Sequence, residues 1–178
     1  TSSYGFLGVG ALLGMMNLIL MISRNNNNSA RVNFTIRELV NIIEIALLIG
    51  LIMVTLGSFL GGVWANESWG RYWGWDPKET WALVTVLVYA FISHMHKIPG
   101  FKGNFAVSAA ALVGFSSVLM TYFGVNYYLS GLHSYAQGEP APVPSGVYVA
   151  VVVVFILIGW AYFSDKKLKE NIPSENKL

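Results

Sequence analysis

The chain has 178 residues, of which 54% are hydrophobic and 11% are charged, and its net charge is +2. An ordinary soluble domain carries about 25% charged residues, so this composition excludes a typical soluble domain and indicates a membrane protein. So small a charge excess gives no case for nucleic-acid binding, and the lack of cysteine excludes disulfides, thiolate metal sites and cysteine nucleophiles.

Apolar segments long enough to span a bilayer recur along the chain. A spanning helix needs about 20 apolar residues, because a rise of about 1.5 Å per residue must cover a core about 30 Å thick. Five segments are predicted to span the membrane: residues 4–22, 39–63, 80–95, 105–129 and 147–163. We therefore predict an all-α, polytopic transmembrane helix bundle, with a membrane domain over residues 1–163 and a polar cytoplasmic tail over residues 164–178.

Three of these segments have individual features. The first begins within four residues of the start, without an initiator Met or a basic leader, so we expect the sequence to begin inside a longer gene product. The third is short for a span. The fourth is rich in Ala, Gly and Ser, which permit close helix approach in lipid, so it is predicted to be a packed central helix.

The distribution of Lys and Arg predicts the orientation. Connectors 23–38 and 96–104 and the tail together hold nine of these residues, whereas connectors 64–79 and 130–146 hold two. Cytoplasmic loops carry the excess of positive residues. Connector 64–79 is therefore predicted to be external and the C-terminus cytoplasmic.

The external connector is dominated by tryptophan. The run WANESWGRYWGWDPKETW, residues 64–81, holds five of the six tryptophans. One interpretation is an aromatic belt at the membrane interface. The other is a surface for a flat ligand, in which Trp69, Trp73 and Trp75 form an aromatic platform and Gly70 permits close approach. These residues alone leave both interpretations open.

Polar residues at the ends of the third span add to this pattern. Asp76 followed by Pro77 is predicted to cap the span, with Glu79 in its first turn. His94 lies in its last turn at the cytoplasmic boundary, where it is either a functional group or a snorkelled interfacial residue. His133 follows the fourth span on the outer side, either beside the tryptophans or as an ordinary loop histidine.

A flat aromatic surface beside an imidazole suits a metalloporphyrin, because the ring stacks on aromatic side chains while iron accepts a histidine nitrogen. Haem is therefore the leading ligand. Glu44, inside the second span, also needs a partner, which the sequence does not name.

Two stretches carry a family resemblance. Residues 69–81, WGRYWGWDPKETW, resemble the WWD signature of the haem-handling cytochrome c assembly family. Residues 124–136, GVNYYLSGLHSYA, are similar to its CcsA (ResC) branch, the membrane component of the System II cytochrome c synthase. The resemblance extends over residues 4–163 and corresponds to a C-terminal portion of such a subunit.

The resemblance implies a function and a location. Haem b would be held at the outer face of a bacterial inner membrane and joined by thioether bonds to the CxxCH cysteines of an apocytochrome c. The family's first external histidine falls before residue 1. Its other haem-handling positions fall on Trp69, Gly70, Trp73, Trp75 and Asp76 around the ring, with His133 and His94 as iron ligands at different sites. A CcsB (ResB)-type partner subunit, or a fused upstream domain, is implied, and holocytochrome c synthase activity is expected only of the complete assembly.

Two other functions compete with this hypothesis. A haem exporter or carrier would deliver haem to another assembly protein without catalysing attachment, and residues 130–136 argue against it. A secondary transporter unrelated to haem would use Glu44 and His94 as a proton relay, but the sequence has no visible inverted repeat.

Overall fold

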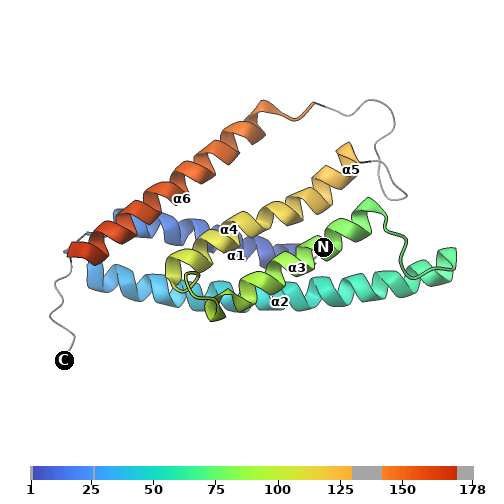
Figure 1. Cartoon of the computed structure of the whole chain (residues 1–178), viewed down its shortest axis with the longest axis horizontal. Helices are drawn as coiled ribbons and strands as arrows, with labels where there is room; N and C mark the ends of the chain where they lie inside the picture. Colours follow the sequence, from blue (N-terminus) through green and yellow to red (C-terminus); the bar gives the residue numbers. More distant parts are fainter. Residues whose placement is uncertain (1, 26, 130–141, 172–178) are drawn as a thin grey trace.

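The structure is a computed structural model that describes the backbone of residues 2–25, 27–129 and 142–171, and side chains through Leu168. These residues form helices and no strand. Four helical spans are long and apolar enough to cross a membrane: Ser2–Ser23, Ser29–Trp69, Asn104–Tyr128 and Ser145–Leu168. The predicted all-α, polytopic membrane bundle is confirmed (Figure 1).

All five predicted spans fall in helices. In chain order the elements are α1 (Ser2–Ser23), α2 (Ser29–Trp69), α3 (Pro77–His94), the 3-10 turn η1 (Met95–Lys97), α4 (Asn104–Leu119), the π-helical turn η2 (Met120–Gly124), α5 (Val125–Tyr128) and α6 (Ser145–Asn171). The third predicted span forms α3 and η1, but α3 is not among the four apolar spans. Its 18 residues rise about 27 Å, slightly less than the hydrocarbon core.

Small residues bring α1 close to its neighbours. A Cβ on Gly50 of α2 would collide with the side chain of Leu7 in α1, and a Cβ on Gly14 of α1 would lie 2.6 Å from the carbonyl oxygen of Ser108 in α4. Lipid gives helices no hydrophobic reason to associate, so close backbone approach and interhelical hydrogen bonds hold such bundles together. Asn17 adds these bonds, because its Nδ2 donates to the Ile36 carbonyl and the Ser108 hydroxyl, both at 3.2 Å.

α4 is the central helix, as its small residues predict. It contacts α1, α2, α3 and α6, and it buries Ser108 and Ala111 completely. The larger core cluster surrounds it: Leu7, Val40, Ile43, Leu47, Tyr89, Ile92, Met95, Val107, Ala111 and Val118. The core therefore joins α1, α2, α3 and α4.

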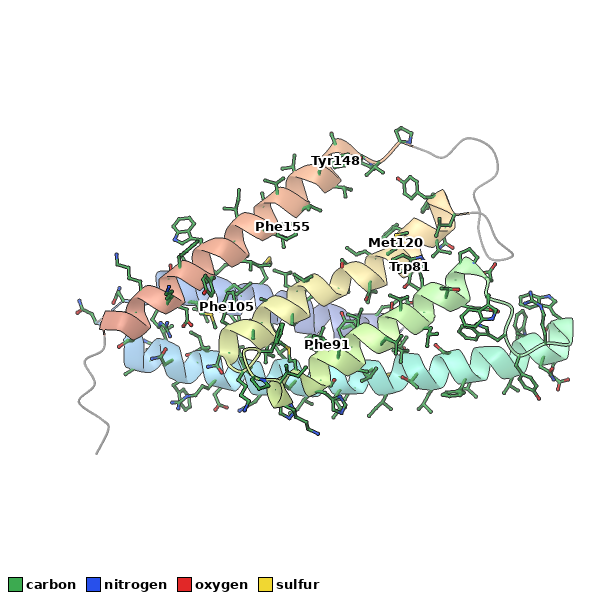
Figure 2. The ribbon with its side chains drawn as sticks, in the orientation of Figure 1. Trp81, Phe91, Phe105, Met120, Tyr148 and Phe155 are labelled. Atoms are coloured by element: carbon green, nitrogen blue, oxygen red, sulfur yellow. The ribbon has the colours of Figure 1, made fainter. Side chains whose placement is uncertain are left out.

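α6 is attached mainly at its C-terminal end. There, Arg24 at the end of α1 forms an ion pair with Asp165, with 2.7 Å between Nη2 and Oδ1. Apolar side chains project outward along the rest of the helix, where Tyr148 is 62% and Phe155 66% exposed (Figure 2). In a bilayer such a surface faces acyl chains or further helices.

The connections between helices gather at two ends of the bundle. This agrees with the prediction that successive connectors lie on opposite sides of the membrane. The α1–α2 turn, η1 and the C-terminal end of α6 lie toward one end (Figure 1). The segment between α2 and α3, the end of α5 and the start of α6 lie toward the other. The tryptophan-rich segment therefore shares its end of the molecule with the helix ends that flank residues 130–141.

Candidate functional site

The C-terminal end of α2 carries the first tryptophans of the site. The sequence predicts a connector from residue 64, but α2 continues to Trp69, because residues 64–69 include neither Gly nor Pro. Gly70 ends the helix with a left-handed φ of 70°, and its N–H donates to the Asn66 carbonyl at 2.8 Å. Trp64 and Trp69 meet edge to face, with ring centroids 5.1 Å apart.

A capping box begins α3, which confirms the predicted cap. Oδ2 of Asp76 accepts from the N–H of Lys78 at 3.2 Å. Oε2 of Glu79 accepts from the N–H groups of Gly74 at 2.7 Å and Asp76 at 3.3 Å, and Pro77 occupies the first turn. One carboxylate therefore ties the irregular segment before α3 to the first turn of this helix.

The irregular segment turns sharply at its end. Trp75 has a φ of 57°, in the left-handed region that residues other than glycine rarely adopt. Its ring is 72% exposed and meets Trp73 edge to face, with centroids 6.0 Å apart. The guanidinium of Arg71 occupies the space that a Cβ on Gly74 would fill. A side chain at residue 74 would therefore have to move the end of this flexible arginine.

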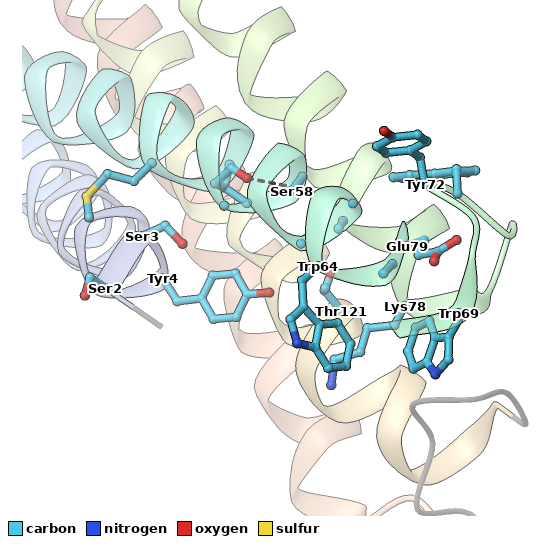
Figure 3. Close-up of a pocket in the computed structure, with 18 residues that line it drawn as sticks. Ser2, Ser3, Tyr4, Ser58, Trp64, Trp69, Tyr72, Lys78, Glu79 and Thr121 are labelled. Carbon is cyan, nitrogen blue, oxygen red and sulfur yellow. Dashed lines mark hydrogen bonds between the residues drawn. The ribbon is translucent and has the colours of Figure 1, made fainter. Parts of the chain in front are cut away.

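A cavity of about 500 Å³ lies between the start of α1, the C-terminal half of α2 and the first turn of α3 (Figure 3). Its aromatic lining residues are Tyr4, Trp64, Trp69, Tyr72 and Trp73. On the α2 side it is lined by Gly57, Gly61 and Gly62. A Cβ on Gly57 or Gly61 would meet no atom within 4 Å, whereas Gly62 lies against the Tyr72 carbonyl. Lys78 and Glu79 are its charged lining residues. Ligand sites are typically concave and largely apolar, with a few polar groups and volumes of about 300–1,000 Å³.

A buried hydroxyl pair supports the cavity from the other side. The hydroxyls of Thr85 in α3 and Thr121 in η2 lie 2.9 Å apart, and both lie within hydrogen-bond distance of the carbonyls of Trp81 and Ser117. Thr121 also lines the cavity. π-helical turns are rare and occur frequently at functional sites. η2 therefore brings a polar group of the α4–α5 span to the wall of the cavity.

The predicted ring-contacting residues divide into two groups. Trp69 and Trp73 line the cavity. Gly70, Trp75 and Asp76 do not: Gly70 caps α2, Asp76 is buried as the cap of α3, and Trp75 points outward. The tryptophan rings meet edge to face within each pair rather than forming one flat surface. Contact of these residues with haem stays a prediction.

Of the two predicted iron ligands, the structure describes only His94. His133 lies outside the described residues. His94 ends α3 about 26 Å along the axis from Pro77, so it is remote from the cavity. Its Nδ1 lies 2.8 Å from the Ala90 carbonyl, which can only accept, so Nδ1 donates and Nε2 is the nitrogen that a metal could use. Glu44 is exposed on α2 and forms no ion pair within the described part of the chain.

Most residues of the cavity wall are not assigned to the site from sequence, and Tyr4, Trp64, Lys78 and Thr121 are four of them. The tryptophan density includes Trp64, and the position of Lys78 beside the Asp76 cap is a usable signal for it. No pattern in the sequence marks Tyr4 or Thr121, because both come from other spans and reach the cavity only through helix packing.

Comparison with known proteins decides the family. The sequence model described as "Cytochrome C assembly protein" matches residues 1–133, which include every residue of the cavity wall. The chain belongs to this cytochrome c assembly family. The resemblance inferred from the tryptophan-rich segment is confirmed.

Relatives in the cytochrome c assembly family give the same result. Protein NrfI of Wolinella succinogenes is 51% identical over 142 residues, which cover 80% of this chain and 16% of that protein. Cytochrome c biogenesis protein CcsA of Prochlorococcus marinus (strain MIT 9301) is 38% identical over 157 residues, covering 75% of this chain and 50% of that protein. CcsA of Chlamydomonas reinhardtii is 43% identical over 133 residues, covering 75% and 37%. The chain thus spans half or less of the length of these relatives.

Proposed function

We propose that this protein binds haem b as a substrate in cytochrome c biogenesis and presents it for covalent attachment to an apocytochrome c. The observation that carries the proposal is the aromatic cavity beneath the tryptophan-rich segment, in a chain whose family is named for cytochrome c assembly. The relatives named CcsA act, by that name, in cytochrome c biogenesis.

The cavity wall suits a flat, largely apolar ligand. Trp64, Trp69 and Trp73 offer aromatic surface, and the Gly57, Gly61 and Gly62 side of α2 offers backbone without side chains. Aromatic rings attract other rings in edge-to-face or offset geometry, so a porphyrin can pack against either arrangement. The volume of about 500 Å³ lies within the usual range for ligand sites.

Histidine would supply the bond to iron. We assign His133 to the haem at the external site, because the end of α5 that precedes it in the chain lies toward the end of the bundle that holds the tryptophans. His94 would serve a second haem site nearer the cytoplasm. A backbone hydrogen bond that fixes Nδ1 and leaves Nε2 free is typical of histidines that bind metals.

The chemistry divides between this protein and the apocytochrome. The CxxCH segment brings the thiols, and each S–H adds across a vinyl group of haem, forming a carbon–sulfur bond and placing the hydrogen on the neighbouring carbon. This chain has no cysteine, so it offers no competing thiol. Its residues hold the ring and leave the vinyl edge open, which is catalysis by positioning.

The proposed topology follows from charge. Connector 64–79 holds Arg71 and Lys78, whereas the connectors and tail of the opposite end hold nine basic residues. Positive residues accumulate on the cytoplasmic side of bacterial inner membranes, so the cavity opens externally and α6 ends in the cytoplasm. A CcsB (ResB)-type subunit, or a domain fused upstream, completes the synthase in this proposal.

Absorption spectroscopy tests haem binding. Protein purified in detergent from haem-replete cells is expected to show a Soret band that shifts on reduction. Trp64→Leu and Trp69→Leu should lower the haem content several-fold, and His133→Ala should shift or weaken the band. Trp160→Leu is the matched control, because Trp160 lies on α6 outside the cavity and is 62% exposed. Wild type without haem, or equal losses in the control, contradicts the proposal.

A second measurement distinguishes covalent attachment of haem to an apocytochrome from transport of haem without attachment. Co-expression with a CxxCH reporter should give haem that stays on the reporter after denaturation and carries a thioether spectrum. Haem that binds this protein but never becomes covalent in the complete assembly indicates a carrier instead.

A further inference from the structure

The wall of the cavity includes a cationic side chain, Lys78, to which the proposed function gives no role. We propose that Lys78 recognises a propionate carboxylate of the bound haem, so that the cavity selects tetrapyrroles whose acid side chains are free. This inference rests on the proposed function and deepens it, because it names the chemical group that orients the ring.

The ammonium group of Lys78 is available to a ligand. Lys78 lines the cavity between Trp64 and Trp69 in the close-up view (Figure 3). Its Nζ makes one long hydrogen bond, 3.4 Å, to Oδ1 of Asn126. No carboxylate lies within ion-pair distance of it among the described residues.

The other charged lining residue does not neutralise it. Glu79 uses its Oε2 to accept two backbone hydrogen bonds, from Gly74 at 2.7 Å and from Asp76 at 3.3 Å. This carboxylate is therefore committed to the cap of α3. Among the described residues of the cavity wall, Lys78 is the cation without an ion-pair partner, and a half-buried ammonium group between Trp64 and Trp69 is stabilised by an anionic ligand.

Two elements fix the position of this lysine. Its backbone N–H is bonded to the Asp76 cap, so its Cα is held in the first turn of α3. Asn126 is 7% exposed and is the second residue of α5, which continues from η2. A π-helical turn inserts one residue and so rotates the following positions by about 100° around the helix axis. η2 thereby sets the face on which Asn126 meets Lys78.

A propionate carboxylate bound to Lys78 would fix the rotation of the porphyrin ring in the cavity. An ammonium–carboxylate bond at one edge of a porphyrin leaves the opposite edge, which carries the vinyl groups of haem b, pointing away from Lys78. Aromatic contacts alone hold a flat ring without choosing its rotation. The lysine therefore supplies the polar contact that distinguishes one edge from the other.

The experiment compares haem b with its dimethyl ester, in which both carboxylates are blocked. Apoprotein in detergent is titrated with each and followed by the Soret band, for wild type, Lys78→Gln and Lys78→Arg. A charge-assisted bond contributes about 1.5–3 kcal/mol, so esterification should weaken wild-type binding roughly 10- to 100-fold. Lys78→Gln should bind haem b with the same affinity that wild type shows for the ester. The affinity of this variant should not fall further when the ester replaces haem b.

Two further variants complete the design. Lys78→Arg keeps the charge and should retain most of the preference for free acid. Lys97→Gln is the matched control, because Lys97 is exposed in η1 at the far end of α3 and should not alter either affinity.

The outcomes separate this inference from the proposed function. Wild type that binds neither compound overturns the proposed function. Wild type that binds both equally overturns the role of Lys78 and leaves haem binding intact, and this comparison needs no variant to fold. Lys78→Gln that loses both compounds in parallel would make the lysine a structural residue, which also overturns the inference.

Discussion

Gly14 of α1 and Ser108 of α4 lie so close that a Cβ on Gly14 would be 2.6 Å from the Ser108 carbonyl oxygen. This obstacle is backbone, which cannot rotate away as a side chain can. Gly5, on the same helix, has no such neighbour within 4 Å. Substitutions at Gly14 and Gly5 therefore report separately on helix packing and on helix propensity.

Gly14→Ala is expected to destabilise the bundle. Overpacking costs about 1–3 kcal/mol, which exceeds the gain of about 1 kcal/mol in helix propensity. Unfolding in mixed micelles with increasing SDS should occur at lower SDS than in wild type. Gly5→Ala, the control, should unfold at the same SDS concentration or higher. Equal behaviour of the two variants would show that α1 and α4 are not in contact at this point.

Asn17→Ala should weaken the same region through hydrogen bonding. Asn17 is fully buried, and its Nδ2 joins α1 to the Ile36 carbonyl in α2 and the Ser108 hydroxyl in α4. Losing these bonds should lower the free energy of unfolding by about 1–3 kcal/mol in the same SDS assay. Asn41→Ala, at an exposed position of α2, should change it by less than about 0.5 kcal/mol. A neutral Asn17→Ala would mean that these two bonds add nothing to stability.

Asp165→Asn tests the ion pair that anchors α6. The side chains of Arg24 and Asp165 are 9% and 13% exposed, so removing one charge leaves the other nearly buried. Breaking a buried pair costs about 3–5 kcal/mol. The thermal midpoint in detergent should fall by several degrees, whereas Lys167→Gln, at an exposed neighbouring position, should leave it unchanged. A thermal midpoint for Asp165→Asn equal to that of wild type would refute an anchoring role for the pair.

Glu79→Ala is expected to loosen the tryptophan-rich segment before it affects the whole bundle. The carboxylate holds the N–H groups of Gly74 and Asp76, and losing a cap of this kind costs about 0.5–2 kcal/mol. Hydrogen exchange in peptides covering residues 70–79 should accelerate, while exchange in α1 and α4 should not. Glu67→Ala, exposed near the end of α2, is the control. Unchanged exchange at residues 70–79 would show that other contacts hold the segment.

The sequence by itself determined the class of fold and the family. Long apolar runs identify membrane helices because lipid offers no hydrogen bonds to exposed backbone, and the cap at Asp76 is recognised from local chemistry alone. The WWD segment was sufficient to predict the family that the comparisons confirm. These properties depend on residues that are neighbours in the chain.

Only the tertiary structure decided which residues surround the cavity. Tyr4, Trp64, Lys78 and Thr121 come from four different elements. They meet because α1 packs closely against α2 and α4, and because η2 turns Thr121 of the α4–α5 span toward α3. Helix contacts in lipid depend on shape complementarity between distant segments, which no local pattern in one sequence records.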